Sequence, residues 1–208
     1  LHTAYRRQRQ MCIRDSSYLD SAAEIYPMVL NYMGKNPNSS ETADIKAATE
    51  VLKKNRPYIK RFTSSGFIDD LARGDTCVTI GFGGDLNIAK RRAEEAGGKE
   101  KIRVMMPKEG VGIWVDSFVI PKDAKHVANA HAYINDFLDP EVAAKNGNFV
   151  TYAPSSKPAQ ELMDEEFRND NTIFPTDEDL KNSFIMVPIQ PAALKFMVRQ
   201  WQSVKAGT

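Results

Sequence analysis

The chain has 208 residues, of which 42% are hydrophobic and 26% are charged, so it is long enough to bury a core in one domain or in two small lobes. Lys and Arg number 28 against 27 Asp and Glu, and the net charge of +1 argues against a nucleic-acid-binding protein, whose affinity comes from clustered cations. No apolar run reaches the roughly 18 residues of a membrane-spanning helix. Two cysteines exclude both a disulfide framework and a zinc cluster.

The first 16 residues differ from the rest of the chain in charge. They contain four arginines and one aspartate, a net charge of +3, so the remainder carries −2. This head has no helical or strand periodicity, and it lacks the apolar stretch of a secretory signal. One interpretation is a basic arm that binds phosphates. The other starts from the string MCIRDS at 11–16, which resembles translated sequencing-adapter sequence; the head is then disordered or no part of the natural protein.

Two helices are predicted after the head. Ser21 and Glu24 have the spacing of a capping box, and apolar residues at helical intervals lead to a stop at Gly34. Pro27 lies inside this pattern, so the helix is expected to kink there or to start late. A second helix ends before Pro57. Its apolar face consists of Ile45, Ala48, Val51 and Leu52.

The rest of the chain alternates between predicted strands and helices. The predicted strands lie at 76–82, 102–106 and 114–120, and 148–153 is expected to be extended. The first of them is bounded by glycines and is expected to be buried. The predicted helices lie at 66–74, 85–96 and 127–138, followed by short helical pieces. A last helix carries Leu194, Met197, Val198 and Trp201 on one face. This alternation predicts an α/β fold.

A glycine-rich turn, Gly81-Phe82-Gly83-Gly84-Asp85, lies between a predicted strand and a predicted helix, where phosphate-binding loops occur. The dinucleotide fingerprint needs a glycine where Leu86 stands, no P-loop lysine follows, and Asp85 would repel phosphate. No nucleotide cofactor is therefore expected. Asp85 either caps the following helix or faces a cleft as a ligand-binding carboxylate, and one side chain can do both.

Trp114 and Asp116 lie two residues apart in a predicted strand, so they share one face and Val115 points to the other. An aromatic ring beside a carboxylate suits a bound cation, because the ring supplies cation–π attraction and the carboxylate an ion pair. The alternative is a core tryptophan next to a surface aspartate.

Metal sites and nucleophiles are not indicated. His126 and His131 lack the i,i+4 spacing of two ligands on one helix face, and His2 lies in the head. No GxSxG motif occurs, and Cys77 in an apolar run is expected to be a packed thiol. We therefore predict no metal ion, no cofactor and no catalytic residue.

Residues 64–85, SSGFIDDLARGDTCVTIGFGGD, resemble the periplasmic polyamine-binding proteins, which are the putrescine- and spermidine-binding subunits of ABC importers, and they are most similar to the putrescine type. Further segments resemble the same family in the same order: SYLD at 17–20 through VLNYMGK at 29–35, RP at 56–57, PKEG at 107–110 and WQSVKAG at 201–207. The resemblance implies the α/β type II periplasmic binding protein fold, incomplete here, with most of the second lobe and part of the first. Residues 1–16 would be a non-family head, and 17–208 the C-terminal portion of a two-lobed solute-binding protein.

The resemblance also implies ligand-binding residues on the first half of the chain. Glu24 corresponds to a carboxylate that binds an amine, and Ser64 to a polar contact in the cleft. In the family's G-W-x-G-D turn the Trp stacks on the methylene chain and the Asp binds an ammonium group. Here Phe82 stands at the Trp position and Asp85 is kept.

In the second half, Trp114 and Asp116 correspond to an aromatic–x–Asp strand of the family, and Tyr152 to a tyrosine that lines the pocket. A polyamine is an apolar rod with an ammonium group at each end, so aromatic walls and carboxylates suit its two parts. The choice between putrescine and spermidine stays open, because Phe82 leaves a slightly larger pocket than Trp.

The function implied is that of a periplasmic protein that captures a polyamine, putrescine in the first place and spermidine next, and delivers it to an ABC permease. It would act as a monomer with no cofactor, no metal, no nucleic-acid partner and no membrane insertion. Two alternatives remain: a polyamine sensor that acts through a protein partner, and a carboxylate-based hydrolase in which Asp85 and Asp116 form an acid–base pair.

Overall fold

A small parallel sheet organises the computed structural model, which describes residues 15–97 and 101–207. Strand β1 (Ser16–Tyr18) lies between β2 (Ile59–Phe62) and β3 (Val78–Thr79), and both pairings are parallel. Parallel neighbours need crossover connections. Helices α2 (Ala22–Tyr32) and α3 (Thr42–Asn55), with the 3₁₀ turn η1 (Arg56–Tyr58), join β1 to β2, and α4 (Phe67–Ala72) joins β2 to β3. All three strands therefore end at the same edge of the sheet.

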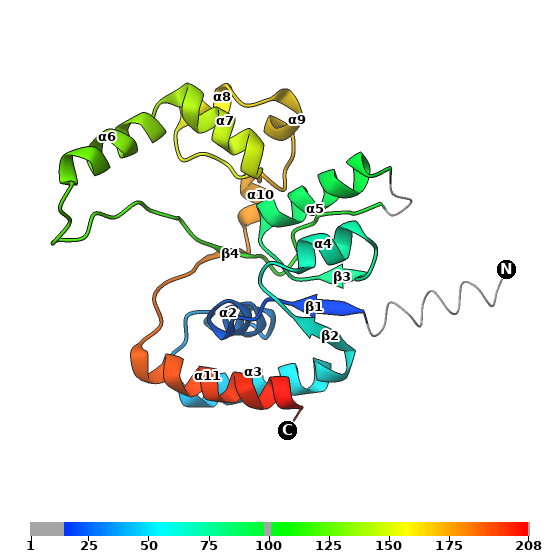
Figure 1. The fold of residues 1–208 in the computed structure, drawn as a ribbon. Helices are drawn as coiled ribbons and strands as arrows, with labels where there is room; N and C mark the ends of the chain where they lie inside the picture. Colours follow the sequence, from blue (N-terminus) through cyan, green and yellow to red (C-terminus); the bar gives the residue numbers. More distant parts are fainter. Residues whose placement is uncertain (1–14, 98–100, 208) are drawn as a thin grey trace.

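The last helix packs back onto the first ones. Helix α11 (Pro191–Ala206) contacts α2 and α3, and Figure 1 shows α3 and α11 side by side on the β2 side of the sheet. The ring of Trp201 on α11 meets Phe62 and Tyr26 edge-to-face, at 5.1 and 6.3 Å between ring centroids. Fully buried side chains of this core include Leu19, Ile25, Leu30, Ile45, Leu52 and Val204. The predicted apolar face of α3 is confirmed, whereas on α11 Met197 and Trp201 are buried as predicted but Val198 is 42% exposed.

Helix α2 differs from the expectation at Pro27 and at its N-cap residue, Ser21. It begins at Ala22 and runs through a buried Pro27, so the predicted late start is wrong. Ser21 is the N-cap residue, but its side chain makes no capping hydrogen bond, so the predicted capping box is not formed. Glu24 therefore stays in the first turn with its carboxylate free of a capping role.

The predicted strands are shorter than expected or absent. Within the described residues β3 has two residues and one neighbour, and Cys77 and Val78 are exposed, so the predicted burial of this strand and of the thiol is wrong. No strand forms at 102–106 or at 114–120, where Val115 is 80% exposed. Strand β4 (Gly112–Ile113) ends before Trp114 and pairs in parallel with β5 (Phe184–Ile185). β-branched residues favour a strand only where a neighbouring strand pairs with them.

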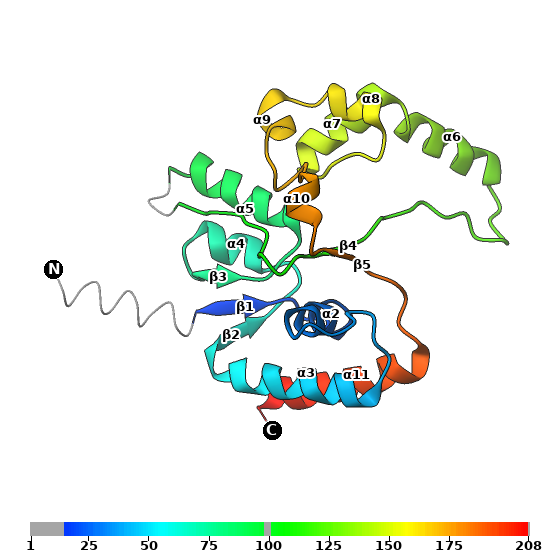
Figure 2. The ribbon, with the colours of Figure 1, turned by 180° about the vertical axis from the view of Figure 1, so that it is seen from behind.

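Helices form an arm beyond the sheet (Figures 1 and 2). It consists of α6 (Val127–Phe137), α7 (Pro140–Val150), α8 (Lys157–Glu161), α9 (Glu165–Arg168) and α10 (Asp177–Leu180). Buried side chains of the arm are Ala143, Ala144, Ala159, Met163 and Ile173. The extended segment predicted at 148–153 is wrong, because α7 continues to Val150 and ends at Thr151 in the left-handed conformation. Helix α6 is confirmed, although none of its residues is buried.

Candidate functional site

The glycine-rich turn opens helix α5 (Gly83–Glu95), and Asp85 lies in the first turn of that helix. Phe82 is the N-cap residue, and no side chain caps the helix. The interpretation of Asp85 as a helix cap is therefore wrong. Instead, the hydroxyl of Tyr152 donates a hydrogen bond to Asp85 Oδ1 at 3.3 Å. The acidic side chain also lies at the positive end of the α5 dipole, which favours its ionised form.

Tyr152 connects two carboxylates. Burial raises the pKa of Asp85 above its ordinary value, against the opposing effect of the hydrogen bond from Tyr152. The pKa of Tyr152 is raised too, mainly by burial, then by the charge of Asp85 and further by that of Asp116. Asp116 therefore acts electrostatically on the same hydroxyl. Among the described residues no Lys or Arg forms an ion pair with Asp85 or Asp116, so their negative charge is uncompensated.

Two aromatic rings lie beside these carboxylates. Phe82 and Trp114 meet edge-to-face with 5.4 Å between ring centroids. The pairing of β4 with β5 ends immediately before Trp114, and the N-terminus of α5 follows Phe82, so the two elements bring the rings together. Trp114 is 40% exposed, which contradicts the alternative of a core tryptophan. Five of the seven predicted residues thus lie in one cluster: Phe82 contacts Trp114, Tyr152 donates to Asp85, and the exposed Asp116 is within electrostatic range of Tyr152.

The other two predicted residues lie on neighbouring elements of the same sheet edge. Glu24 is half-buried in the first turn of α2, shortly after β1, and Ser64 is exposed just after β2. The Oγ of Ser64 accepts a hydrogen bond from the Asp20 backbone N–H at 3.2 Å. Ligands of open α/β sheets bind outside the carboxyl ends of the strands. Within the described residues no hydrogen bond or ion pair joins Glu24 or Ser64 to the five-residue cluster.

Asp20 is a residue at this edge that the sequence did not single out. Its carboxylate accepts hydrogen bonds from Lys205 Nζ at 2.8 Å and from Trp201 Nε1 at 3.2 Å, both on α11. The hydrogen bond from Lys205 holds the pKa of Asp20 below its ordinary value. These contacts join residues at opposite ends of the chain, so no local pattern could have predicted them.

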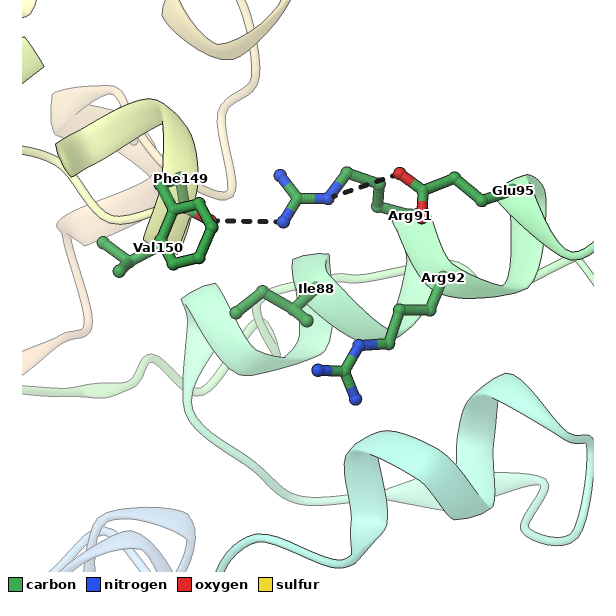
Figure 3. Close-up of a pocket in the computed structure, with 6 residues that line it drawn as sticks. All are labelled: Ile88, Arg91, Arg92, Glu95, Phe149 and Val150. Atoms are coloured by element: carbon green, nitrogen blue, oxygen red, sulfur yellow. Dashed lines mark hydrogen bonds and ion pairs between the residues drawn. The ribbon is translucent and has the colours of Figure 1, made fainter. Parts of the chain in front are cut away.

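A separate hollow lies between α5 and α7 (Figure 3). It is lined by Ile88, Arg91, Arg92, Glu95, Phe149 and Val150. Arg91 extends across it and donates a hydrogen bond to the backbone oxygen of Phe149 at 3.2 Å. None of the seven predicted residues lines this hollow.

Among the described residues, no helix is long and apolar enough to cross a bilayer.

Comparisons with known proteins identify the family. The model of the bacterial extracellular solute-binding proteins matches residues 3–176. The chain is 39% identical over 191 residues to the putrescine-binding periplasmic protein SpuD of Pseudomonas aeruginosa, and 38% identical over 192 residues to the putrescine-binding periplasmic protein PotF of Escherichia coli. Each alignment covers 92% of this chain and 52% of the relative. The chain therefore spans about half the length of these curated relatives.

A solved structure shows the same fold. The spermidine/putrescine ABC transporter substrate-binding protein PotD of Streptococcus pneumoniae superposes with a TM-score of 0.77 at 26% identity, over 94% of this chain and 59% of that chain. The predicted periplasmic binding protein fold is thereby confirmed as a partial one. The family match begins inside the basic head, most of which lies outside the described residues, so the boundary expected at residue 16 stays a prediction.

The family is one of solute-binding proteins and not of enzymes, which contradicts the hydrolase alternative. The arrangement of the site agrees with this, because it offers charge and aromatic surface to a ligand. The chain belongs to the bacterial extracellular solute-binding protein family.

Proposed function

We propose that the chain is part of a periplasmic protein that captures a polyamine, putrescine in the first place and spermidine second, and delivers it to the permease of an ABC importer. The observation that carries the proposal is a half-buried carboxylate, Asp85, and an exposed one, Asp116, which form no ion pair with any described Lys or Arg and lie next to an aromatic pair. Partial burial makes the charge of Asp85 costly unless a cation compensates it. A diamine supplies that cation and an apolar chain in one molecule.

The geometry supports the following roles for the individual residues. Asp85 and Asp116 would each accept hydrogen bonds from an ammonium group, and the rings of Phe82 and Trp114 would contact the methylene chain. The Tyr152 hydroxyl, which donates to Asp85, would keep that carboxylate oriented. Glu24 and Ser64 lie after the other two strands and would reach the ligand from their own side of the sheet edge.

Calorimetry on the complete product of the gene tests the proposal with three ligands that share a four-carbon chain. Putrescine has two ammonium groups, butylamine has one and 1,4-butanediol has none. We expect putrescine to bind more tightly than butylamine by about 10- to 150-fold, the value of one charge-assisted hydrogen bond, and butanediol not to bind. Spermidine should bind more weakly than putrescine. No binding of putrescine or spermidine would overturn the proposal.

Two variants test whether the affinity for putrescine depends on Asp85. Asp85→Asn should weaken putrescine binding by at least about tenfold, because the ammonium group loses a charged partner. Asp136→Asn is the matched control, since Asp136 is an exposed carboxylate on α6. Its affinity should equal that of the parent protein. Equal affinities of all three proteins would contradict the role of Asp85.

A further inference from the structure

Thr151 has a backbone conformation that is unusual for its residue type. It ends α7 with φ 56° and ψ 36°, and it is the one non-glycine residue with positive φ in the described ranges. A β-branched residue is a genuine outlier in this region, where glycine or asparagine is the usual choice. Such a residue persists only where its surroundings hold it there.

The side chain of Thr151 is buried, with 2% of its surface exposed, and its hydroxyl is hydrogen-bonded. Its Oγ1 lies 2.7 Å from the backbone oxygens of both Gly84 and Val150, so the hydroxyl donates across the gap between α7 and the first turn of α5. The left-handed turn directs the next residue, Tyr152, toward the same first turn, where its hydroxyl reaches Asp85.

Gly84 makes room for this contact. A Cβ atom on Gly84 would lie 2.1 Å from the ring of Tyr152, which no side chain could occupy without displacing the ring. At the preceding Gly83, a Cβ would meet only the Thr172 backbone oxygen at 3.8 Å, an ordinary contact. The tyrosine ring therefore lies directly on the bare backbone of α5 at Gly84.

A second set of hydrogen bonds joins the end of α7 to α5, two turns beyond Gly84. Arg91 donates to the backbone oxygens of Asn148 at 3.4 Å and Phe149 at 3.2 Å, as Figure 3 shows for the latter. The last carbonyl groups of a helix lack partners within the helix, and a guanidinium group satisfies them and the negative end of the helix dipole. The α7 terminus is thus fixed to α5 on both sides of the Thr151 turn.

We propose that Thr151 is a positioning residue of the ligand site: its left-handed turn and its hydrogen bond to Gly84 place the Tyr152 hydroxyl on Asp85. Thr151 acts through Tyr152 and does not itself contact the ligand. The part of this proposal that concerns affinity rests on the proposed function; the part that concerns the Tyr152–Asp85 contact does not.

Two substitutions separate positioning from stability. Thr151→Gly removes the hydroxyl but accepts positive φ without strain, so the protein should melt within a few degrees of the parent. It should bind putrescine about tenfold more weakly, the effect of one lost hydrogen bond. Thr151→Ser keeps the hydroxyl and should bind within about twofold of the parent. Gly84→Ala should weaken binding as Thr151→Gly does, whereas Gly83→Ala should not.

A ligand-free readout tests the contact itself. In protein labelled with 3-fluorotyrosine, the ¹⁹F resonance of Tyr152, assigned with Tyr152→Phe, should shift when Asp85→Asn is introduced, because its hydroxyl donates to that carboxylate. The shift should persist in the Thr151→Ser background and vanish in the Thr151→Gly background. Persistence of the shift in Thr151→Gly would overturn the proposal. Parallel losses of melting temperature and binding in both Thr151 variants would also overturn it, since they indicate a merely structural role. A parent protein that shows the ¹⁹F response but binds no putrescine would refute the proposed function and leave the positioning intact.

Discussion

The packing of α11 against α2 and α3 leads to a quantitative prediction about Trp201. This side chain is 3% exposed, meets Phe62 and Tyr26 edge-to-face, and donates its indole N–H to the Asp20 carboxylate at 3.2 Å. Trp201→Phe removes the donor and the larger ring together. A hydrogen bond to a charged acceptor contributes about 1.5–3 kcal/mol, and the lower figure applies because Lys205 still binds Asp20.

The smaller ring adds a packing loss of about 1 kcal/mol, so the free energy of unfolding should fall by about 2–3 kcal/mol in total. Urea unfolding followed by far-UV circular dichroism measures this change as a shift of the midpoint at an unchanged slope. Trp114→Phe is the control with the same chemical change: Trp114 is 40% exposed, and its loss should cost less than about 1 kcal/mol. Equal midpoints for the two variants would refute the packing of α11 described above.

Three further predictions concern the site and the arm. Because burial raises the pKa of Asp85, its native state binds a proton more tightly than its unfolded state, so Asp85→Asn should raise the free energy of unfolding near neutral pH. This gain should shrink as the pH falls through the raised native pKa and vanish below the unfolded pKa; a urea series across pH checks the sign. By the same shift, putrescine affinity should fall on acidification at a higher pH than for an ordinary carboxyl, a dependence that calorimetry should find weakened in Asp85→Asn. The 208-residue chain should bind a hydrophobic dye through the exposed rings of Phe118 and Tyr133, which are 52% and 59% exposed, and Phe118→Ser should reduce that signal; dye fluorescence no greater than that of a compact protein would contradict this.

The helices could be predicted and most of the sheet could not. The apolar faces of α3 and α11 repeat at helical intervals, so a local pattern contains the information. Strands β1 and β2, SSY and IKRF, have no run of β-branched residues and form because distant segments pair with them. Conversely, the β-rich residues after Trp114 remain unpaired and exposed. Pairing is a long-range property that a single window of sequence does not carry.

The residues of the candidate site also divide into those that the sequence could predict and those that it could not. Phe82, Asp85, Trp114, Asp116 and Tyr152 were predicted from the family resemblance, and only Asp85 and the Trp114–Asp116 pair also stood out by their chemistry; the structure places these residues in one cluster. The Thr151 turn was missed, because nothing in the sequence of a β-branched residue signals a left-handed conformation.

The most direct test of the account is a crystal structure of the complete gene product with putrescine. We predict one ammonium group within hydrogen-bond distance of Asp85 or Asp116, and the methylene chain against the rings of Phe82 and Trp114. Putrescine bound elsewhere, such as in the hollow between α5 and α7, with both carboxylates uncontacted, would contradict it.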